Sequence, residues 1–325
     1  MTELTIVQAV NLTLFEEMRR NKDILVLGED IGRNGGVFRA TEGLIDEFGM
    51  NRIIDTPLNE SGIIGFAIGL GLYGLKPVAE IQFADFIWPA ADQMVSELAK
   101  FRYRTGGEYS CPVVVRAPYG GGIKGSHYHS QSIEAFFVHN AGIKVVIPSN
   151  PYDTKGLLTS ALREPDPVLF LEPKSIYRAF KQEVPEGDYT VPIGKAAIPR
   201  EGTDVTIIAY GAMIPVCLEA ANICQEEHNI SCEIVDLRTL MPYDLEAIEK
   251  SVKKTGRVVV VYEAPKTLGY GAEISATIAE KFIEYLESPI LRVAGMDTPF
   301  PFTLEMDYLP DPYKVTEAVI KSYKF

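Results

Sequence analysis

Short apolar runs that alternate with segments of helical periodicity most strongly constrain the fold of this chain. Apolar and β-branched residues fill runs such as Ile24–Leu27 and Val168–Leu171, and they dominate Pro77–Ile81. Between the runs, apolar residues recur at helical spacing, and Thr5 and Gln8 form a predicted capping box at the head of the first such segment. Strands that alternate with helices predict an α/β fold with a mostly parallel sheet that helices cover on both faces.

The alternation occurs twice along the chain. In the first series, further helices are predicted over 60–73, 89–102 and 153–163, and further strands over 113–116 and 144–147. In the second, strands are predicted over 205–209, 232–235, 258–261 and 290–293, and helices over 212–227, 243–254, 271–286 and 313–323. A stretch rich in Pro and Gly separates the two series. We therefore predict two α/β domains, residues 1–185 and 201–325, joined by a linker at 186–200.

Composition narrows the classes of partner and compartment. The net charge of -13 argues against nucleic acid, because phosphate binding needs clustered Lys and Arg. The longest uncharged apolar run, Ile63–Leu75, is too short to span a bilayer. The amino-terminal residues do not have the pattern of a signal peptide, and the four cysteines form no Cys-x-x-Cys pair. We expect a cytoplasmic protein with reduced thiols and no membrane partner.

Two glycine motifs lack the context that their usual functions need. Gly69-x-Gly71-x-x-Gly74 has the spacing of a dinucleotide fingerprint, but it ends a predicted helix and precedes a strand, which is the reverse of the required order. A nicotinamide dehydrogenase is therefore disfavoured. The loop Gly120–Ser126 lacks the ending of a phosphate loop.

The first candidate for chemistry is Glu60, which falls in the first turn of a predicted helix. Its carboxylate either interacts with the helix dipole or takes part in a site. The same helix carries Gly65-x-x-x-Gly69, a face almost without side chains. Because each glycine in a helix costs about 1 kcal/mol relative to alanine, this face predicts close approach to another element, in this chain or in another subunit.

Two further candidates follow predicted strands. Ligands of open α/β sheets bind outside the carboxyl ends of the strands, and Phe86 and Trp88 lie just after the strand at 77–81. They are either a flat ring platform or part of the core. His127 and His129 follow the glycine loop. Their spacing permits a shared metal, but no third ligand lies nearby in the sequence, so we favour proton transfer by a loop histidine over metal binding.

The motifs around these residues resemble one known family. They are Asp55–Ile63, Glu80–Phe86, Phe101–Gly106, Tyr128–Ser132 and Lys144–Ser149, with Val258–Glu263 and Gly271–Ile274 in the second series. The chain resembles, nearly end to end, the beta subunits of the thiamine-diphosphate-dependent decarboxylating component of pyruvate and branched-chain 2-oxoacid dehydrogenase complexes. The resemblance implies a pyrimidine-binding domain followed by a transketolase C-terminal-like domain.

The resemblance also implies roles for individual residues. Glu60 matches the carboxyl that bonds the ring nitrogen of the cofactor's aminopyrimidine, and Phe86 matches the ring that stacks on the pyrimidine. His129 matches a histidine implicated in passing the acyl group to lipoamide. A potassium ion bound by backbone carbonyls is implied by alignment at Cys111, Val113, Val114, Ala161, Glu164 and Asp166.

Partners are implied in the same way. Members of this class hold the diphosphate through magnesium and a Gly-Asp-Gly motif, which this chain lacks; its nearest pair, Gly187–Asp188, precedes Tyr189. We therefore expect an alpha subunit to hold magnesium in an alpha2beta2 heterotetramer. The chain is expected to be active only in that assembly. The face of Gly65 and Gly69 suits packing against that subunit. The remaining implied partner is a lipoyl-bearing dihydrolipoyl acyltransferase core.

The implied function is oxidative decarboxylation of a 2-oxoacid and reductive acylation of a lipoyl domain. The runs Leu171–Arg178 and Tyr128–Phe137 look closer to branched-chain members. A pyruvate-specific member of the family and a non-catalytic scaffold subunit are the alternatives. The chain has Glu60, Phe86 and His129 at the matched positions, which disfavours the non-catalytic scaffold subunit.

Overall fold

The computed structural model describes residues 1–325, which divide into two compact units. Unit 1 comprises Met1–Tyr119 and Phe136–Ile193, and unit 2 comprises Gly120–Ala135 and Gly194–Phe325. The segment Gly120–Ala135 thus belongs to unit 2, although unit 1 flanks it in the sequence. The domains predicted from the sequence, residues 1–185 and 201–325, stay a prediction. None of the helices has the length and apolar character needed to cross a membrane.

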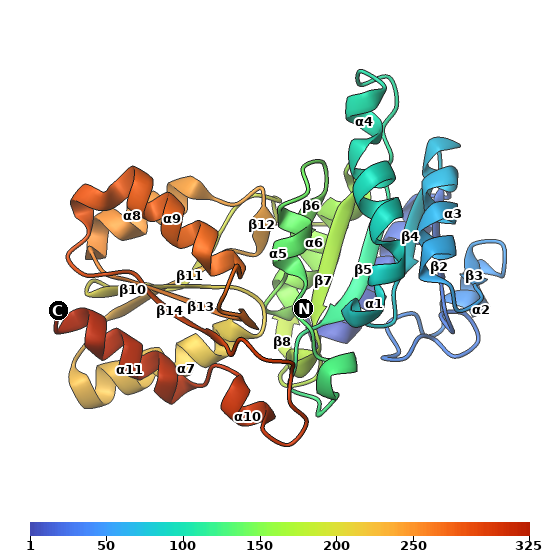
Figure 1. Cartoon of the computed structure of the whole chain (residues 1–325). Coiled ribbons are helices and arrows are strands. Elements are labelled where there is room, and N and C mark those ends of the chain that lie inside the picture. The colour runs from blue at the N-terminus through green and yellow to red at the C-terminus, as the bar shows by residue number, and fades with distance from the viewer. The chain divides into compact units, whose positions relative to one another are not determined.

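Unit 1 is built on a parallel sheet in the order β6-β7-β5-β4-β2-β3 (Figure 1). Its strands are β2 (Ile24–Gly28), β3 (Ile53–Asp55), β4 (Lys76–Glu80), β5 (Val114–Tyr119), β6 (Lys144–Val146) and β7 (Val168–Pro173). Its helices are α1 (Ile6–Arg20), α2 (Leu44–Phe48), α3 (Glu60–Leu72), α4 (Phe101–Arg104) and α6 (Pro151–Arg163); α5 (Glu134–Val138) begins in unit 2. Strands β2, β5 and β7 are buried along their whole length, as expected for a sheet covered on both faces.

Unit 2 has a five-stranded sheet in the order β14-β13-β10-β11-β9. Its elements are β9 (Ala197–Arg200), β10 (Val205–Ala209), α7 (Met213–His228), β11 (Cys232–Asp236), β12 (Thr239–Met241), α8 (Leu245–Thr255), β13 (Val258–Pro265), α9 (Tyr270–Phe282), β14 (Leu291–Gly295), α10 (Glu305–Tyr308) and α11 (Pro312–Tyr323). Helices α7 and α11 lie on one side of the sheet and α8 and α9 on the other (Figure 1). The α/β class predicted for both halves is confirmed.

Local patterns predicted most of the longer elements; the short strands β3 and β12 were not predicted, and two predicted stretches differ from the structure. The capping box of Thr5 and Gln8 is present at the start of α1. The helix predicted over 89–102 is irregular: 3-10 turns over Trp88–Ala90 and Leu98–Lys100 flank a π-helical turn over Gln93–Glu97. There the N–H of Leu98 bonds the carbonyl of Gln93, five residues back, and apolar periodicity cannot reveal such a turn.

The second difference lies in the predicted linker. Residues 197–200 form β9, which pairs antiparallel with β11 at the edge of the unit 2 sheet. Proline and glycine in 186–200 masked this short strand. In unit 1, β8 (Gln182–Val184) pairs antiparallel with β1 (Thr2–Leu4).

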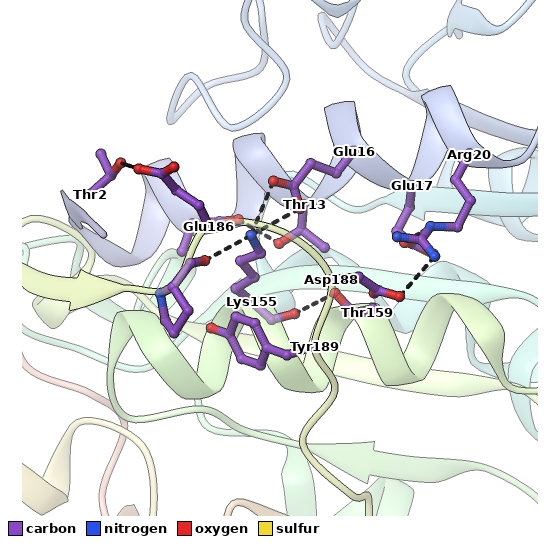
Figure 2. A network of polar contacts seen from close by, with 12 residues as sticks. Thr2, Thr13, Glu16, Glu17, Arg20, Lys155, Thr159, Glu186, Asp188 and Tyr189 are labelled. Atoms are coloured by element: carbon purple, nitrogen blue, oxygen red, sulfur yellow. Dashed lines mark hydrogen bonds and ion pairs between the residues drawn. The ribbon is translucent and has the colours of Figure 1, made fainter.

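A polar network fastens the end of unit 1 to its first helix (Figure 2). The Lys155 ammonium, on α6, is 3.1 Å from a Glu16 carboxylate oxygen and donates to the Pro185 carbonyl at 3.2 Å. The side chain of Lys155 is only 1% exposed. Nearby, Arg163 donates to Asp188 at 2.6 Å. The chain after β8 is thereby held by two cations of one helix.

Replacing Lys155 tests this network. Lys155→Met keeps most of the buried stem but leaves the Pro185 carbonyl and Glu16 without their cation. We expect a loss of about 1–3 kcal/mol in the free energy of unfolding, because a buried polar group loses its partner. Urea denaturation measures the change. Lys250→Met, which removes an exposed i,i+4 pair with Glu246, is the control and should change little. Equal effects of the two substitutions would contradict the prediction.

Candidate functional site

Glu60 is buried at the head of a helix. It is the first residue of α3 and is 9% exposed. Asn59 caps the helix, because its side-chain oxygen accepts the N–H of Gly62 at 3.0 Å. The helix begins where the sequence predicts, after the short strand β3. The carboxyl group therefore lies at the positive end of the helix dipole and away from bulk water.

A second buried carboxyl, which sequence reasoning missed, interacts with Glu60. Glu29 directly follows β2, is 7% exposed, and its Oε1 has no hydrogen-bond partner. Burial raises the pKa of the Glu29 carboxyl, and repulsion by Glu60 raises it further, while a hydrogen bond to the Asn59 backbone acts in the opposite direction. Strands β2 and β3 are parallel neighbours, so both carboxyls lie beyond carboxyl ends of adjacent strands. Burial and the repulsion between the two carboxyls therefore favour the protonated form of Glu29.

The aromatic candidates are in different surroundings. Phe86 ends a 3-10 turn (Ala84–Phe86) after β4 and is half-buried. Its ring packs edge-on against Phe83 with centroids 5.5 Å apart. Trp88 is 40% exposed and packs edge-on against Phe136. The Ser61 hydroxyl donates to the Pro89 carbonyl, which ties the start of α3 to the chain just after these rings.

A buried ion network lies beneath the site in unit 1. The Arg116 guanidinium on β5 donates to Glu80 on β4 at 2.7 Å and to Glu172 on β7 at 2.6 and 2.9 Å. The Tyr177 hydroxyl also donates to Glu172. Burial alone would lower the pKa of Arg116, but the two carboxylates raise it above its ordinary value. The network joins the neighbouring strands β4, β5 and β7, and the sequence did not point to it.

His129 lies in the unit 2 segment that follows the glycine loop. It is half-buried, and its backbone N–H donates to the Ser126 carbonyl at 3.3 Å. His127 is exposed, and its ring lies 4.0 Å from that of Tyr128. A cavity of about 360 Å³ is lined by His127, Ser130 and Gln131 together with Phe300 and Tyr308. No group of three or more His, Cys, Asp or Glu is arranged to hold a metal ion.

The residues aligned with a potassium site come from two stretches that the structure brings together. The Val113 carbonyl accepts the N–H of Val168 at 3.0 Å, so the residues before β5 and before β7 are neighbours. The Cys111 carbonyl accepts the N–H of Val113 at 2.8 Å, and burial raises the pKa of the Cys111 thiol to about 12. The side chain of Asp166 pairs with Arg102.

Gly65 and Gly69 lie on an open face of α3. Both are exposed, and an added Cβ at either would meet nothing within 4 Å. Tyr73, one turn further on, is 86% exposed. This face packs against no element of unit 1.

Comparison with known proteins gives family matches over nearly the whole chain. The model of the transketolase pyrimidine binding domain matches residues 2–179, and that of the transketolase C-terminal domain matches 194–315. The mitochondrial 2-oxoisovalerate dehydrogenase subunit beta of Dictyostelium discoideum is 53% identical over 98% of this chain and 86% of its own length. The pyruvate dehydrogenase E1 component subunit beta of Bacillus subtilis is 50% identical over 100% of both.

Among solved structures, a split gene transketolase, described as an inactive beta4 tetramer, has a TM-score of 0.81 and covers 99% of both chains. Its sequence identity is 24%, so this likeness bears on the fold alone.

The raised pKa of Glu29 predicts how stability depends on pH. A carboxyl whose pKa is raised on folding stabilises the folded state below its ordinary value of 4.5, and this contribution is lost as pH rises through the folded-state pKa. Glu29→Gln removes the titration and keeps an acceptor for the Asn59 backbone. We therefore expect the variant to be more stable than the natural chain at neutral pH, with the difference shrinking as pH falls toward 4.5.

Urea denaturation at a series of pH values measures this difference. Glu108→Gln, at an exposed position of unit 1, is the control and should show no such trend. A pH-independent difference for Glu29→Gln would refute the assignment of a raised pKa.

Proposed function

The chain belongs to the family of 2-oxoacid dehydrogenase E1 beta subunits, and on this premise we propose its reaction, its site residues and its partners. The proposed reaction is oxidative decarboxylation of a 2-oxoacid, with a branched-chain substrate favoured, followed by reductive acylation of a lipoyl domain. The observation that carries the proposal is the buried carboxyl pair of Glu60 and Glu29 at the carboxyl edge of the unit 1 sheet.

The residues in unit 1 fit the aminopyrimidine of thiamine diphosphate, the cofactor that the family implies. Glu60 is a buried carboxyl at a helix head, and the buried Oε1 of Glu29 has no partner in the chain. A buried polar atom without a partner costs about 1–3 kcal/mol, which a ligand's donor group would relieve. The half-buried ring of Phe86 supplies a flat apolar surface.

The roles of the chain's own groups follow from their surroundings. When bound, thiamine diphosphate supplies the electron sink for loss of carbon dioxide. Glu60 would bond the ring nitrogen of the aminopyrimidine and would hold a proton at that atom. Burial and the nearby Glu60 raise the pKa of Glu29, which favours its protonated form beside this site. Phe86 would orient the pyrimidine, and the ion network of Arg116 holds strands β4, β5 and β7 together.

Magnesium and the diphosphate are proposed to be held by an alpha subunit. The nearest Gly-Asp pair of this chain ends in Asp188, which is already bound by Arg163 at 2.6 Å and by Arg20 at 2.8 Å. Hydrogen bonding to Arg163 lowers the pKa of Asp188. The open glycine face of α3 supports packing against that subunit, in an alpha2beta2 heterotetramer. A lipoyl-bearing dihydrolipoyl acyltransferase core completes the proposed partners.

Potassium is proposed where the stretches before β5 and β7 adjoin, through the carbonyls named above. The adjacency of Val113 and Val168 supports this, because ligands from two stretches must converge on one ion. A cytosolic location stays a proposal. The four cysteines are buried free thiols, as expected in a reducing compartment, but one of the relatives above is mitochondrial.

The alternatives differ in what they require. A pyruvate-specific member would use the same site residues, and relatives of both kinds are about equally similar to the chain. The branched-chain preference rests on the sequence of residues 171–178 and 128–137. A scaffold subunit would have no need of the buried Glu60–Glu29 pair, which is costly unless it is used.

Coexpression with the alpha subunit and assay against a panel of 2-oxoacids tests the function. The assembled protein should decarboxylate branched-chain substrates with an artificial electron acceptor. Glu60→Gln keeps the size but not the charge of the side chain, and should reduce turnover by at least about 100-fold, as loss of a proton-transfer group does, without preventing assembly. Glu108→Gln is the control. Near-normal turnover of Glu60→Gln would reduce Glu60 to a helix-end charge.

His129 is expected to act after decarboxylation. A protonated imidazole can donate an N–H proton, as protonating a departing thiolate requires. His129→Ala should therefore slow acyl transfer to a lipoyl domain about 100- to 10,000-fold, the range of general-acid catalysis, and slow decarboxylation with an artificial acceptor less. His127→Ala is the matched control and should be milder in both assays. Comparable losses in both assays for His129→Ala would assign it to cofactor or substrate positioning instead.

A further inference from the structure

The glycine loop before His129 is held by a buried glutamate from far along the chain. Glu305, the first residue of α10, accepts the backbone N–H of Gly122 at 2.6 Å with one carboxylate oxygen. Its other oxygen accepts the N–H of Lys124 at 2.9 Å. Glu305 is 4% exposed. Backbone amides directed at one anion form a nest, and hydrogen bonds to a carboxylate are about twice as strong as neutral ones.

A second glutamate and a ring support the same loop. Glu263, on β13, accepts the N–H of Gly121 at 3.2 Å and is 5% exposed. At Gly121 an added Cβ would lie 2.4 Å from the Phe300 ring, so the loop passes too close to this ring for any side chain. The loop is therefore seated against β13 and the residues around α10, and its path is closely determined.

The loop in turn contacts His129 directly. A Cβ added at Gly125 would lie 2.6 Å from the Cβ of His129, and the Ser126 carbonyl accepts the His129 N–H. Lys124 and Ser126 have φ of 56° and 57°, a left-handed conformation that side chains rarely adopt. Such a conformation persists where surrounding contacts hold it, and the bond from Lys124 to Glu305 is one of those contacts.

We propose that Glu305 is a positioning residue for His129. Through Gly122 and Lys124 it holds the glycine loop in the conformation that places the histidine backbone, and so the imidazole, for proton transfer to the departing thiolate. This inference rests on the proposed function of His129. In this arrangement Glu305 does not contact the substrate. It acts on His129 through the loop segment that follows Lys124. Loss of its charge should therefore affect the step that uses His129 more than the step that uses Glu60.

The test is Glu305→Gln in the assembled alpha–beta protein, assayed as above. The amide presents one donor group to two backbone donors and loses the charge-assisted bonds. We expect acylation of a lipoyl domain to fall about tenfold more than decarboxylation with an artificial acceptor. Asp307→Asn removes a charge from the exposed side of the same short helix and serves as the matched control; it should leave the ratio of the two rates unchanged. Glu305→Asp, which keeps the charge but shortens the reach, replaces the glutamine variant if that variant does not assemble.

A double-mutant cycle separates positioning from a general structural role. If Glu305 acts through His129, the doubly substituted Glu305→Gln, His129→Ala protein should transfer acyl groups no more slowly than His129→Ala alone. Additive losses, or equal losses of Glu305→Gln in both assays, would overturn the proposal. If the natural protein shows no 2-oxoacid decarboxylation at all, the proposed function fails instead, and this outcome is distinguished by the activity of the unsubstituted complex.

Discussion

The buried guanidinium of Arg116 is the interaction on which the site in unit 1 depends. It bonds Glu80 and Glu172, so the neighbouring parallel strands β4, β5 and β7 are joined by charged hydrogen bonds between buried side chains. Removing one partner of such a buried pair leaves an unpaired charge and typically costs about 3–5 kcal/mol. Glu80 ends β4 and directly precedes the residues that lead to Phe86. By holding Glu80, the ion network fixes the end of β4, from which the chain leads to the ring of Phe86.

Buried carboxyl groups serve two different purposes in this chain. Glu172 and Glu305 are satisfied by donors of the protein itself, so they fix structure. Glu29 and Glu60 repel one another, and one oxygen of Glu29 has no partner. A pair of this kind lowers stability and makes sense where a ligand completes it. All four carboxyls are buried, so burial alone does not distinguish them. The protein's own donors bond Glu172 and Glu305, whereas Glu29 has an oxygen without a partner, and this difference separates the structural carboxyls from those of the site.

Residues of the site could be predicted where the signal is local. Glu60 was found because it falls in the first turn of a predicted helix, and the helix begins there. Glu29 could have been found by the same reasoning, since it is the first charged residue after a fully apolar strand. Glu305 could not, because it lies 183 residues from Gly122 and its sequence neighbours carry no periodic pattern. The strand that precedes Phe86 and Trp88 did not show which of the two rings is buried. Only the packing shows that Trp88 is the more exposed ring.

The sequence by itself determined the α/β class, nine of the fourteen strands and most helices, because apolar periodicity and helix capping act within a few residues. The motifs from Asp55 to Ser149 were also sufficient to indicate the family. Only the tertiary structure decided that Gly120–Ala135 belongs to unit 2, that a π turn interrupts the helix after Trp88, and that Glu29 lies beside Glu60. These features depend on burial and on charges brought together from distant positions, and such interactions leave no periodic trace in the chain.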